Sequence, residues 1–230
     1  MKRSITHLSV ITFTGLCAVN AADIPIGIEW LSGLRSEYLH RGIQNAGSLT
    51  ELQLQSSYSL SQDESVELSL WQLGGRESSF AEYGVELGYA QSLGRYSMTP
   101  SVRYREIEEG VETSTAELGF ELSYRWSDDF ATSFEASYQE AEAAILASLS
   151  AEYSYVLTDD SYVVGQLSIH SADDYHGLSG LYDVTGTLRY IHHINDFLTV
   201  TPFAQVSEVF HTSSVHETRG SLGLLLSVFF

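Results

Sequence analysis

The sequence has almost no lysine and very little cysteine. Lys2 is the only lysine among 230 residues, and the chain carries 11 lysines and arginines against 30 aspartates and glutamates, a formal net charge of −19. Because binding to a phosphate backbone depends on Lys and Arg contacts, this charge excludes nucleic acid as a partner. Cys17 is the only cysteine, so no disulfide within the chain contributes to its fold.

Long hydrophobic runs are also missing. No stretch of about eighteen apolar residues occurs, which excludes a membrane-spanning helix. The N-terminus instead has the features of a secretory signal: the positive Met1-Lys2-Arg3, a mildly apolar stretch over 8–19, and the small-residue cleavage site Val19-Asn20-Ala21. We therefore expect residues 1–21 to be a cleaved signal peptide and residues 22–230 to form one domain.

Cys17 lies inside this predicted signal peptide. A lipid-anchored cysteine is the competing interpretation. However, Leu16 precedes Cys17, at a position where lipoprotein signals have a small residue. We therefore favour removal of Cys17 with the signal.

Segments of alternating apolar and polar residues fill the rest of the chain. In the clearest of them, Thr115 to Trp126, apolar residues from Ala116 to Trp126 alternate with polar residues from Glu117 to Arg125. This period of two is typical of strands with two different faces, and no helical period persists long enough to compete. Twelve strands are predicted, over 26–41, 50–60, 65–73, 82–93, 95–106, 115–126, 130–139, 145–157, 162–170, 178–192, 197–209 and from about 217 to 230.

The turns between these strands alternate in length. Short turns centre near Gln62, Gly94, Asp128, Asp159 and Asn195. Longer connections are expected at 41–49, 74–81, 107–114, 171–177 and 211–216. Short turns at one end and longer loops at the other are typical of outer-membrane barrels. The sequence thus predicts an all-β, antiparallel, up-and-down transmembrane β-barrel of about 12 strands, with both termini at the short-turn end.

A soluble β-sandwich would show the same alternation. The apolar face favours the barrel, because its aromatic residues gather near strand ends, as in the two interfacial girdles of membrane barrels. These are Trp30, Tyr58, Tyr96, Trp126 and Tyr155 at the short-turn end, and Tyr38, Tyr83, Tyr104 and Tyr138 at the loop end. The polar face mixes Gly, Ser and Ala with charged residues, which suits an enclosed lumen.

The last strand, Ser221–Phe230, is predicted to close the barrel. Leu222, Leu224, Leu226 and Val228 share one of its faces, and we expect it to pair with the first strand and leave no free edge. Phe230 would lie at the periplasmic interface and resembles the terminal aromatic residue of barrel-assembly signals. The barrel-assembly machinery is therefore an expected partner.

The stretch Ser36-Glu-Tyr-Leu-His-Arg-Gly-Ile-Gln44 follows the pattern S-x-Y-x-x-R-G-[IV]-Q. It resembles the S-x-Y-x-x-R-G-[IV]-S-Q signature of a family of uncharacterised bacterial outer-membrane β-barrels, and differs from it by lacking the Ser before Gln. The hairpin from Leu49 to Trp71 is also similar to that family's N-terminal hairpin. The resemblance implies a location and a fold, because the family has no settled function.

Charged residues on the polar face predict a network inside the lumen. Tight turns about Gly94 and Asp128 put Glu86 opposite Arg103 and Glu121 opposite Glu135. The expected network comprises Glu86, Arg103, Glu121, Arg125, Glu135 and Glu152. It is either structural or a constriction that selects cations, as rings of carboxylates do in channels.

Two further groups of polar residues suggest other functions. At the mouth, Arg41 is expected to pair with Glu37 or a loop carboxylate, or to contact an anionic lipid or solute. An enzyme would need a nucleophile beside a base, which His170-Ser171 and His211-Thr-Ser213 suggest; the second resembles the active-site motif of outer-membrane lipid A deacylases. The histidines are too scattered for metal-ligand spacing, and no metal or cofactor is expected.

The sequence as a whole favours a monomeric barrel in the bacterial outer membrane. Its expected function is that of a small porin-like channel or a sealed structural barrel with a charged lumen. Outer-membrane lipids surround it, and small cationic solutes are candidate ligands. The alternatives are a lipid-modifying outer-membrane hydrolase and a secreted soluble β-sandwich that binds a ligand.

Overall fold

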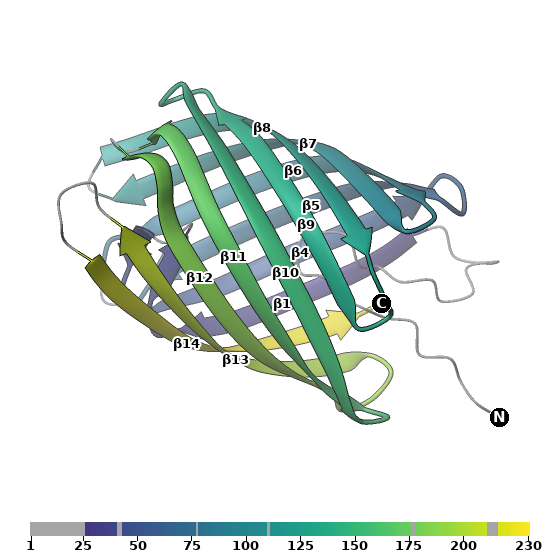
Figure 1. The fold of residues 1–230 in the computed structure, drawn as a ribbon. Helices are drawn as coiled ribbons and strands as arrows, with labels where there is room; N and C mark the ends of the chain where they lie inside the picture. The colour runs from purple at the N-terminus through teal and green to yellow at the C-terminus, as the bar shows by residue number, and fades with distance from the viewer. Residues whose placement is uncertain (1–25, 41–42, 77, 110, 176–177, 211–215) are drawn as a thin grey trace.

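The computed structural model describes residues 26–40, 43–76, 78–109, 111–175, 178–210 and 216–230. These residues form fourteen strands, of which twelve close into one antiparallel barrel in chain order (Figure 1). The barrel strands are β1 (Ile26–Arg35), β4 (Leu49–Ser59), β5 (Glu64–Gly75), β6 (Ala81–Leu93), β7 (Tyr96–Glu109), β8 (Val111–Arg125), β9 (Phe130–Gln139), β10 (Ala144–Thr158), β11 (Ser161–Tyr175), β12 (Leu178–His193), β13 (Leu198–Phe210) and β14 (His216–Phe229). The predicted twelve-stranded barrel is confirmed, and the sandwich alternative is wrong.

The two faces of the strands point where the alternation predicts. The apolar faces lie outside, where side chains such as Leu118, Leu149 and Leu222 are more than half exposed. The polar faces line the interior. Eight of the nine predicted girdle aromatics are exposed on the outside, namely Trp30, Tyr58, Tyr83, Tyr96, Tyr104, Trp126, Tyr138 and Tyr155. Among the described residues no helix has the length and apolarity to span a membrane.

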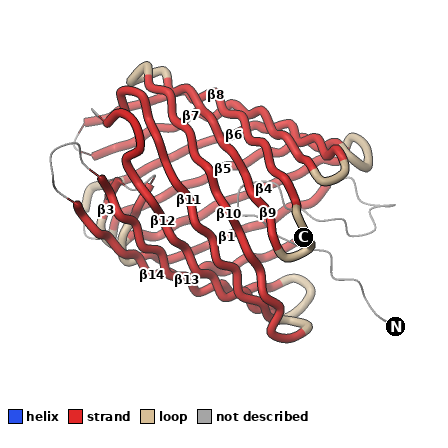
Figure 2. The backbone as a smooth tube through the Cα atoms, in the orientation of Figure 1, coloured by secondary structure: helices blue, strands red, loops and turns tan. Residues whose placement is uncertain are grey.

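The barrel closes between its first and last strands. β1 pairs with β14 in a register that puts Trp30 opposite Val228, and on its other side β1 pairs with β4. No edge of the sheet is left open to pair with another chain. The short turns lie at the same end as Ile26 and Phe229, as predicted, and the strands run continuously around the wall (Figure 2).

Two of the predicted longer connections, 107–114 and 171–177, are shorter than expected. Strands β7 and β8 stay paired as far as Glu109 and Val111, and β11 and β12 as far as Tyr175 and Leu178. The hydrophilic composition of these segments suggested loops, but a strand that extends beyond the apolar band needs no apolar face. The longest connection, between β1 and β4, contains the short strands β2 (Tyr38–His40) and β3 (Ile43–Ala46).

The first predicted strand, 26–41, is wrong at its end, because β1 stops at Arg35. The amide of Leu222 donates to the Ser36 hydroxyl at 2.9 Å, and the amide of Ser36 donates to the Leu222 carbonyl at 2.8 Å. The Ser221 hydroxyl then donates to the Glu37 carbonyl at 2.7 Å. The first strand ends at these bonds to β14, and the chain then bends toward the interior of the barrel.

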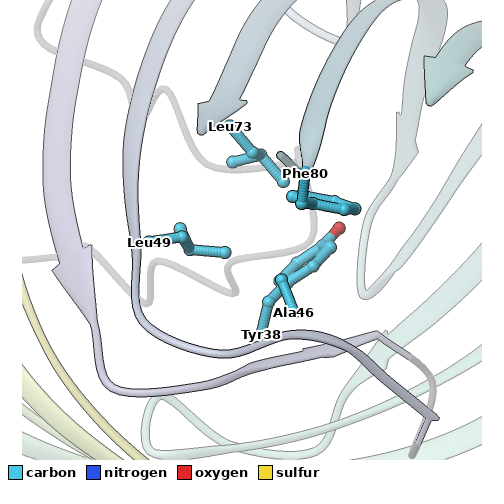
Figure 3. Close-up of a cluster of buried hydrophobic side chains, with 5 residues drawn as sticks. All are labelled: Tyr38, Ala46, Leu49, Leu73 and Phe80. Carbon is cyan, nitrogen blue, oxygen red and sulfur yellow. The ribbon is translucent and has the colours of Figure 1, made fainter. Parts of the chain in front are cut away.

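Strands β2 and β3 pair with each other in a separate two-stranded sheet, here called the inner hairpin. Figure 3 shows Tyr38 and Ala46 of this hairpin packed with Leu49, Leu73 and Phe80 of the barrel. The rings of Tyr38 and Phe80 lie 5.7 Å apart between centroids. Tyr38 is only 8% exposed, so its predicted place in the outer girdle is wrong. The bend at Ser36 and Glu37 carries it into the lumen.

Candidate functional site

The lumen contains a cavity of about 410 Å³, here called the lumenal cavity. Its wall comes from β1 and β4–β9, and Tyr38 and Leu39 of the inner hairpin also line it. Small polar-face residues leave this space open: Gly119 faces Ser101 across β7 and β8. The charged lining residues are five glutamates and three arginines, namely Glu51, Glu82, Glu86, Glu121, Glu135, Arg35, Arg103 and Arg105.

Arg103 connects carboxylates on both neighbouring strands. Its Nε donates to Glu86 Oε2 at 3.0 Å, and its Nη1 donates to Glu117 Oε1 at 3.2 Å. Glu86 and Arg103 are directly opposite each other, as the hairpin register predicts, and Arg103 is likewise opposite Glu117. Since both carboxylates are shielded from bulk water, these charge-assisted bonds hold β6, β7 and β8 in a fixed arrangement.

Arg35 makes a second ion pair at the end of β1. Its Nε and Nη2 both lie 2.8 Å from Glu51 Oε2, and its guanidinium stands 5.1 Å from the centroid of the Phe203 ring. The carboxylate and the aromatic face therefore hold the cation in place across the barrel closure. Sequence reasoning missed Arg35 and Glu51 as site residues, although the alternation put Arg35 on the polar face.

Glu82 joins the inner hairpin to the barrel wall. It is 2% exposed, and it accepts a hydrogen bond from Trp71 Nε1 at 2.9 Å and a longer one from the Tyr38 hydroxyl at 3.4 Å. Burial raises the pKa of Tyr38, and the negative charge of Glu82 raises it further. Tyr38 therefore keeps its proton and donates to Glu82 throughout the physiological pH range.

Trp71 lies flat against Gly84 on the neighbouring strand. A Cβ atom at Gly84 would come within 1.9 Å of Trp71 Cζ2, so only glycine permits this position of the indole. Sequence reasoning missed Trp71 and Glu82. The signal that would have found them is a tryptophan on the polar face directly opposite a glycine.

Glu121 and Glu135 lie directly opposite each other on β8 and β9, as predicted, and both line the lumenal cavity. Glu121 also accepts a hydrogen bond from the Ser123 hydroxyl at 2.7 Å. Carboxylates in directly opposite positions repel each other. With the other lining residues they give the cavity five carboxylates and three guanidinium groups.

Glu152 and Arg125 lie outside this cluster. Glu152 is four residues along β10 from Ser148, the partner of Glu135, which is about 13 Å of strand. Its carboxylate accepts a bond from Arg189 Nη2 at 2.5 Å. Arg125 is exposed at the short-turn end. The predicted network is thus divided into the cavity cluster, a separate Glu152–Arg189 pair and an arginine at the rim.

The two mouth residues have different outcomes. Glu37 lies at the bend after β1, where its backbone carbonyl is held by Ser221. Arg41 lies outside the described residues, so its predicted contact stays a prediction.

Neither histidine–serine motif forms a pair of nucleophile and base among the described residues. His211 and Ser213 lie outside the described residues. His170 Nδ1 is 2.6 Å from Asp183 Oδ2, and this carboxylate is also bonded by Thr185 and Ser207. A bulge beside His170 turns both Tyr182 and Asp183 inward, which makes this group part of the packed lumen.

One Ser–His contact was missed. Ser161 Oγ lies 2.8 Å from His192 Nδ1, and the Tyr190 hydroxyl donates to the same serine at 3.3 Å. Ser161 is 6% exposed, so its oxygen is covered rather than presented to a substrate. Within the described residues no group of three or more His, Cys, Asp or Glu side chains is arranged to hold a metal ion.

No family model matches this chain, and no curated protein matches it in sequence. Solved structures do match in fold. The NanC porin has a TM-score of 0.56 at 13% identity, covering 87% of this chain and 98% of its own. An outer membrane channel from Pseudomonas putida F1 has a TM-score of 0.56 at 9% identity, covering 94% and 100%. The KdgM porin has a TM-score of 0.51 at 11% identity, covering 86% and 97%. The chain thus shares the fold of outer-membrane barrels, while the resemblance at Ser36–Gln44 stays a prediction.

Proposed function

We propose that this protein is a porin-like channel of the bacterial outer membrane that favours small cations over anions. The observation that carries the proposal is the contrast between the two faces of the barrel. Apolar side chains and two aromatic belts cover the outside, whereas the inside holds charged side chains around a cavity of about 410 Å³. Such a wall is stable in lipid and offers a polar interior to solutes.

The charge of the lining sets the expected selectivity. Five glutamates and three arginines line the lumenal cavity, and two of the glutamates are directly opposite each other. Carboxylates around a narrow passage stabilise cations and repel anions. The KdgM porin has also been solved with oligogalacturonate, an acidic ligand. The acidic lining of the present barrel favours the opposite charge.

Two further aspects of the proposal concern its location. Lipids of the outer membrane surround the apolar outside, and we expect a monomer, because the closed barrel leaves no sheet edge for another chain to pair with. The barrel-assembly machinery is proposed to recognise β14 and the residue that follows it, Phe230, which is 72% exposed. Heat-modifiable gel mobility in an outer-membrane fraction supports this location, whereas recovery as a soluble periplasmic protein contradicts it.

Planar lipid bilayers test the channel directly. We expect the purified barrel to conduct, and a potassium chloride gradient to give a reversal potential of the sign for cation preference. The double change Glu121→Gln with Glu135→Gln is expected to move the reversal potential toward zero. Glu140→Gln is the control, because Glu140 is an exposed turn residue, and this change is expected to leave the reversal potential unchanged. A barrel that carries no current, or one that prefers anions, would refute the proposal.

A further inference from the structure

We infer that the lumenal cavity is a binding site for a small organic cation that carries one ammonium or guanidinium group beside a flat apolar part. This inference rests on the proposed channel and names the class of solute that the channel holds. Three independent features of the cavity support it: polar atoms that lack a partner, carboxylates in opposite positions, and an indole in the lining.

The first feature is unused hydrogen-bonding capacity in the lining. Glu51 and Thr99 are 6% and 7% exposed, and both line the cavity. Glu51 Oε1 and Thr99 Oγ1 have no hydrogen-bond partner among the described residues. Arg35 occupies only the other oxygen of this carboxylate, Oε2. Buried polar atoms normally have a partner, so both oxygens are available to N–H donors of a bound solute.

The second feature is the distribution of charge. Arg103 is engaged by Glu86 and Glu117, and Arg35 by Glu51, at 2.8 to 3.2 Å. Glu121 and Glu135 lie directly opposite each other on neighbouring strands and face the same cavity, whose lining holds five glutamates against three arginines. This excess of negative charge favours a cation over an anion.

The third feature is the position of Trp71. Its Nε1 donates to Glu82 at 2.9 Å and its ring packs on Gly84, so the indole is fixed before any solute arrives. Tryptophan is the aromatic side chain that attracts cations most strongly, and it also packs against flat apolar groups. A cavity of about 410 Å³ lies within the range of small-molecule sites. The charge and the ring together select an aryl or alkyl cation over a bare metal ion.

Calorimetric titration of the folded full-length barrel in detergent tests this inference without any need for conduction. The probes are benzylammonium, its anionic counterpart phenylacetate, and neutral benzyl alcohol. We expect benzylammonium to bind and phenylacetate to give no heat. Benzyl alcohol is expected to bind at least about tenfold more weakly than benzylammonium, because it lacks a charge-assisted bond.

Three variants locate the bound cation. Glu51→Gln and the double change Glu121→Gln with Glu135→Gln are each expected to weaken benzylammonium binding by about tenfold or more. Trp71→Phe is expected to weaken it less, because a benzene ring still faces the cation. Glu140→Gln removes one charge from an exposed turn and is expected to change nothing. Heat-modifiable mobility shows that each variant is folded.

The outcomes separate this site from the channel itself. Equal binding of phenylacetate, or benzylammonium binding that survives both carboxylate changes in folded protein, would overturn the site. A barrel that conducts cations selectively but does not bind benzylammonium would also overturn it and leave the channel intact. A barrel that binds benzylammonium with the expected variant pattern but carries no current would support the site and refute the channel.

Discussion

At the scale of single residues, two glycines inside the barrel accept aromatic rings from the neighbouring strand. Gly84 lies against Trp71, and Gly223 lies against Phe203, whose ring also faces the Arg35 guanidinium. An aromatic ring packed across a strand covers the backbone of the glycine. The ring also occupies the space in the lumen that a side chain at the glycine position would need. The two glycines therefore fix the position of the indole that donates to Glu82 and of the phenyl ring that faces Arg35.

A methyl group at Gly223 tests this packing. In Gly223→Ala the new Cβ would lie 2.2 Å from Phe203 Cε1 and 2.8 Å from the Leu34 carbonyl, which is backbone of β1. We expect the variant to lose about 1–3 kcal/mol of unfolding free energy, as overpacked sites do. Urea unfolding in lipid vesicles measures it.

Gly186→Ala is the matched control, because a Cβ atom there would have no neighbour within 4 Å. We expect its unfolding free energy to stay within about 0.5 kcal/mol of the parent. If both variants lost the same amount, glycine flexibility rather than the Phe203 contact would explain the effect.

Charged residues that face each other within one hairpin were predictable from sequence. The relative positions of charged residues on several strands were not. A short turn fixes the register of one hairpin, so Glu86 opposite Arg103 and Glu121 opposite Glu135 follow from counting residues back from the turn. Glu152 was included in the same network, but it lies four residues further along β10 than the partner of Glu135. Its true offset depends on how each successive strand is staggered, which alternation alone does not encode.

At the scale of elements, the inner hairpin was the main surprise. The alternation continues through Ser36 and Tyr38, so the local sequence gives no sign that β1 ends at Arg35. The signals that end it are bonds from Leu222 and Ser221, which lie more than 180 residues further along the chain. A contact of that separation cannot be inferred from a local pattern.

Removing the inner hairpin is expected to widen the passage. Replacing Tyr38–Ala46 by a Gly-Ser linker of equal length removes Tyr38 and Leu39 from the lining of the cavity, while the twelve barrel strands keep all their pairings. We expect heat-modifiable barrel to form and single-channel conductance to rise. Recordings in planar bilayers measure the change.

The control for this variant replaces Glu140–Ala143, the turn between β9 and β10, with a Gly-Ser linker of the same length. This turn contributes no residue to the lining of the cavity, so conductance is expected to stay at the level of the parent. Equal conductance in the parent and in the hairpin variant would show that the hairpin does not narrow the passage.

At the scale of the whole molecule, the alternation predicted the strands, and the aromatic residues near the strand ends favoured a barrel over a sandwich. Every strand of a membrane barrel must satisfy two solvents at once. Lipid requires apolar residues on one face, and a polar lumen requires the opposite on the other, so the period of two recurs in all twelve strands. The ends of β7, β8, β11 and β12 leave the apolar band, lose this constraint and looked like loops. The pattern therefore reports the membrane-embedded part of each strand and not its full length.

The last two residues extend the pairing of β14 toward both of its neighbouring strands. The amide of Phe229 donates to the Phe197 carbonyl at 2.8 Å, and the amide of Phe230 donates to the Ile28 carbonyl at 2.9 Å. Deleting both residues removes the Glu29–Phe229 rung of the β1–β14 pairing and leaves both carbonyls without these backbone partners. We expect refolding of this deletion into lipid vesicles to give less heat-modifiable barrel than the parent gives.

A paired change to leucine separates the backbone from the rings. Phe229→Leu with Phe230→Leu keeps both amides, so we expect this variant to refold in vesicles as the parent does. In cells we expect it to accumulate less barrel than the parent, since the proposed recognition of β14 by the assembly machinery uses the exposed ring of Phe230. If the deletion refolded as well as the leucine variant, the backbone bonds of Phe229 and Phe230 would not be needed to form the barrel.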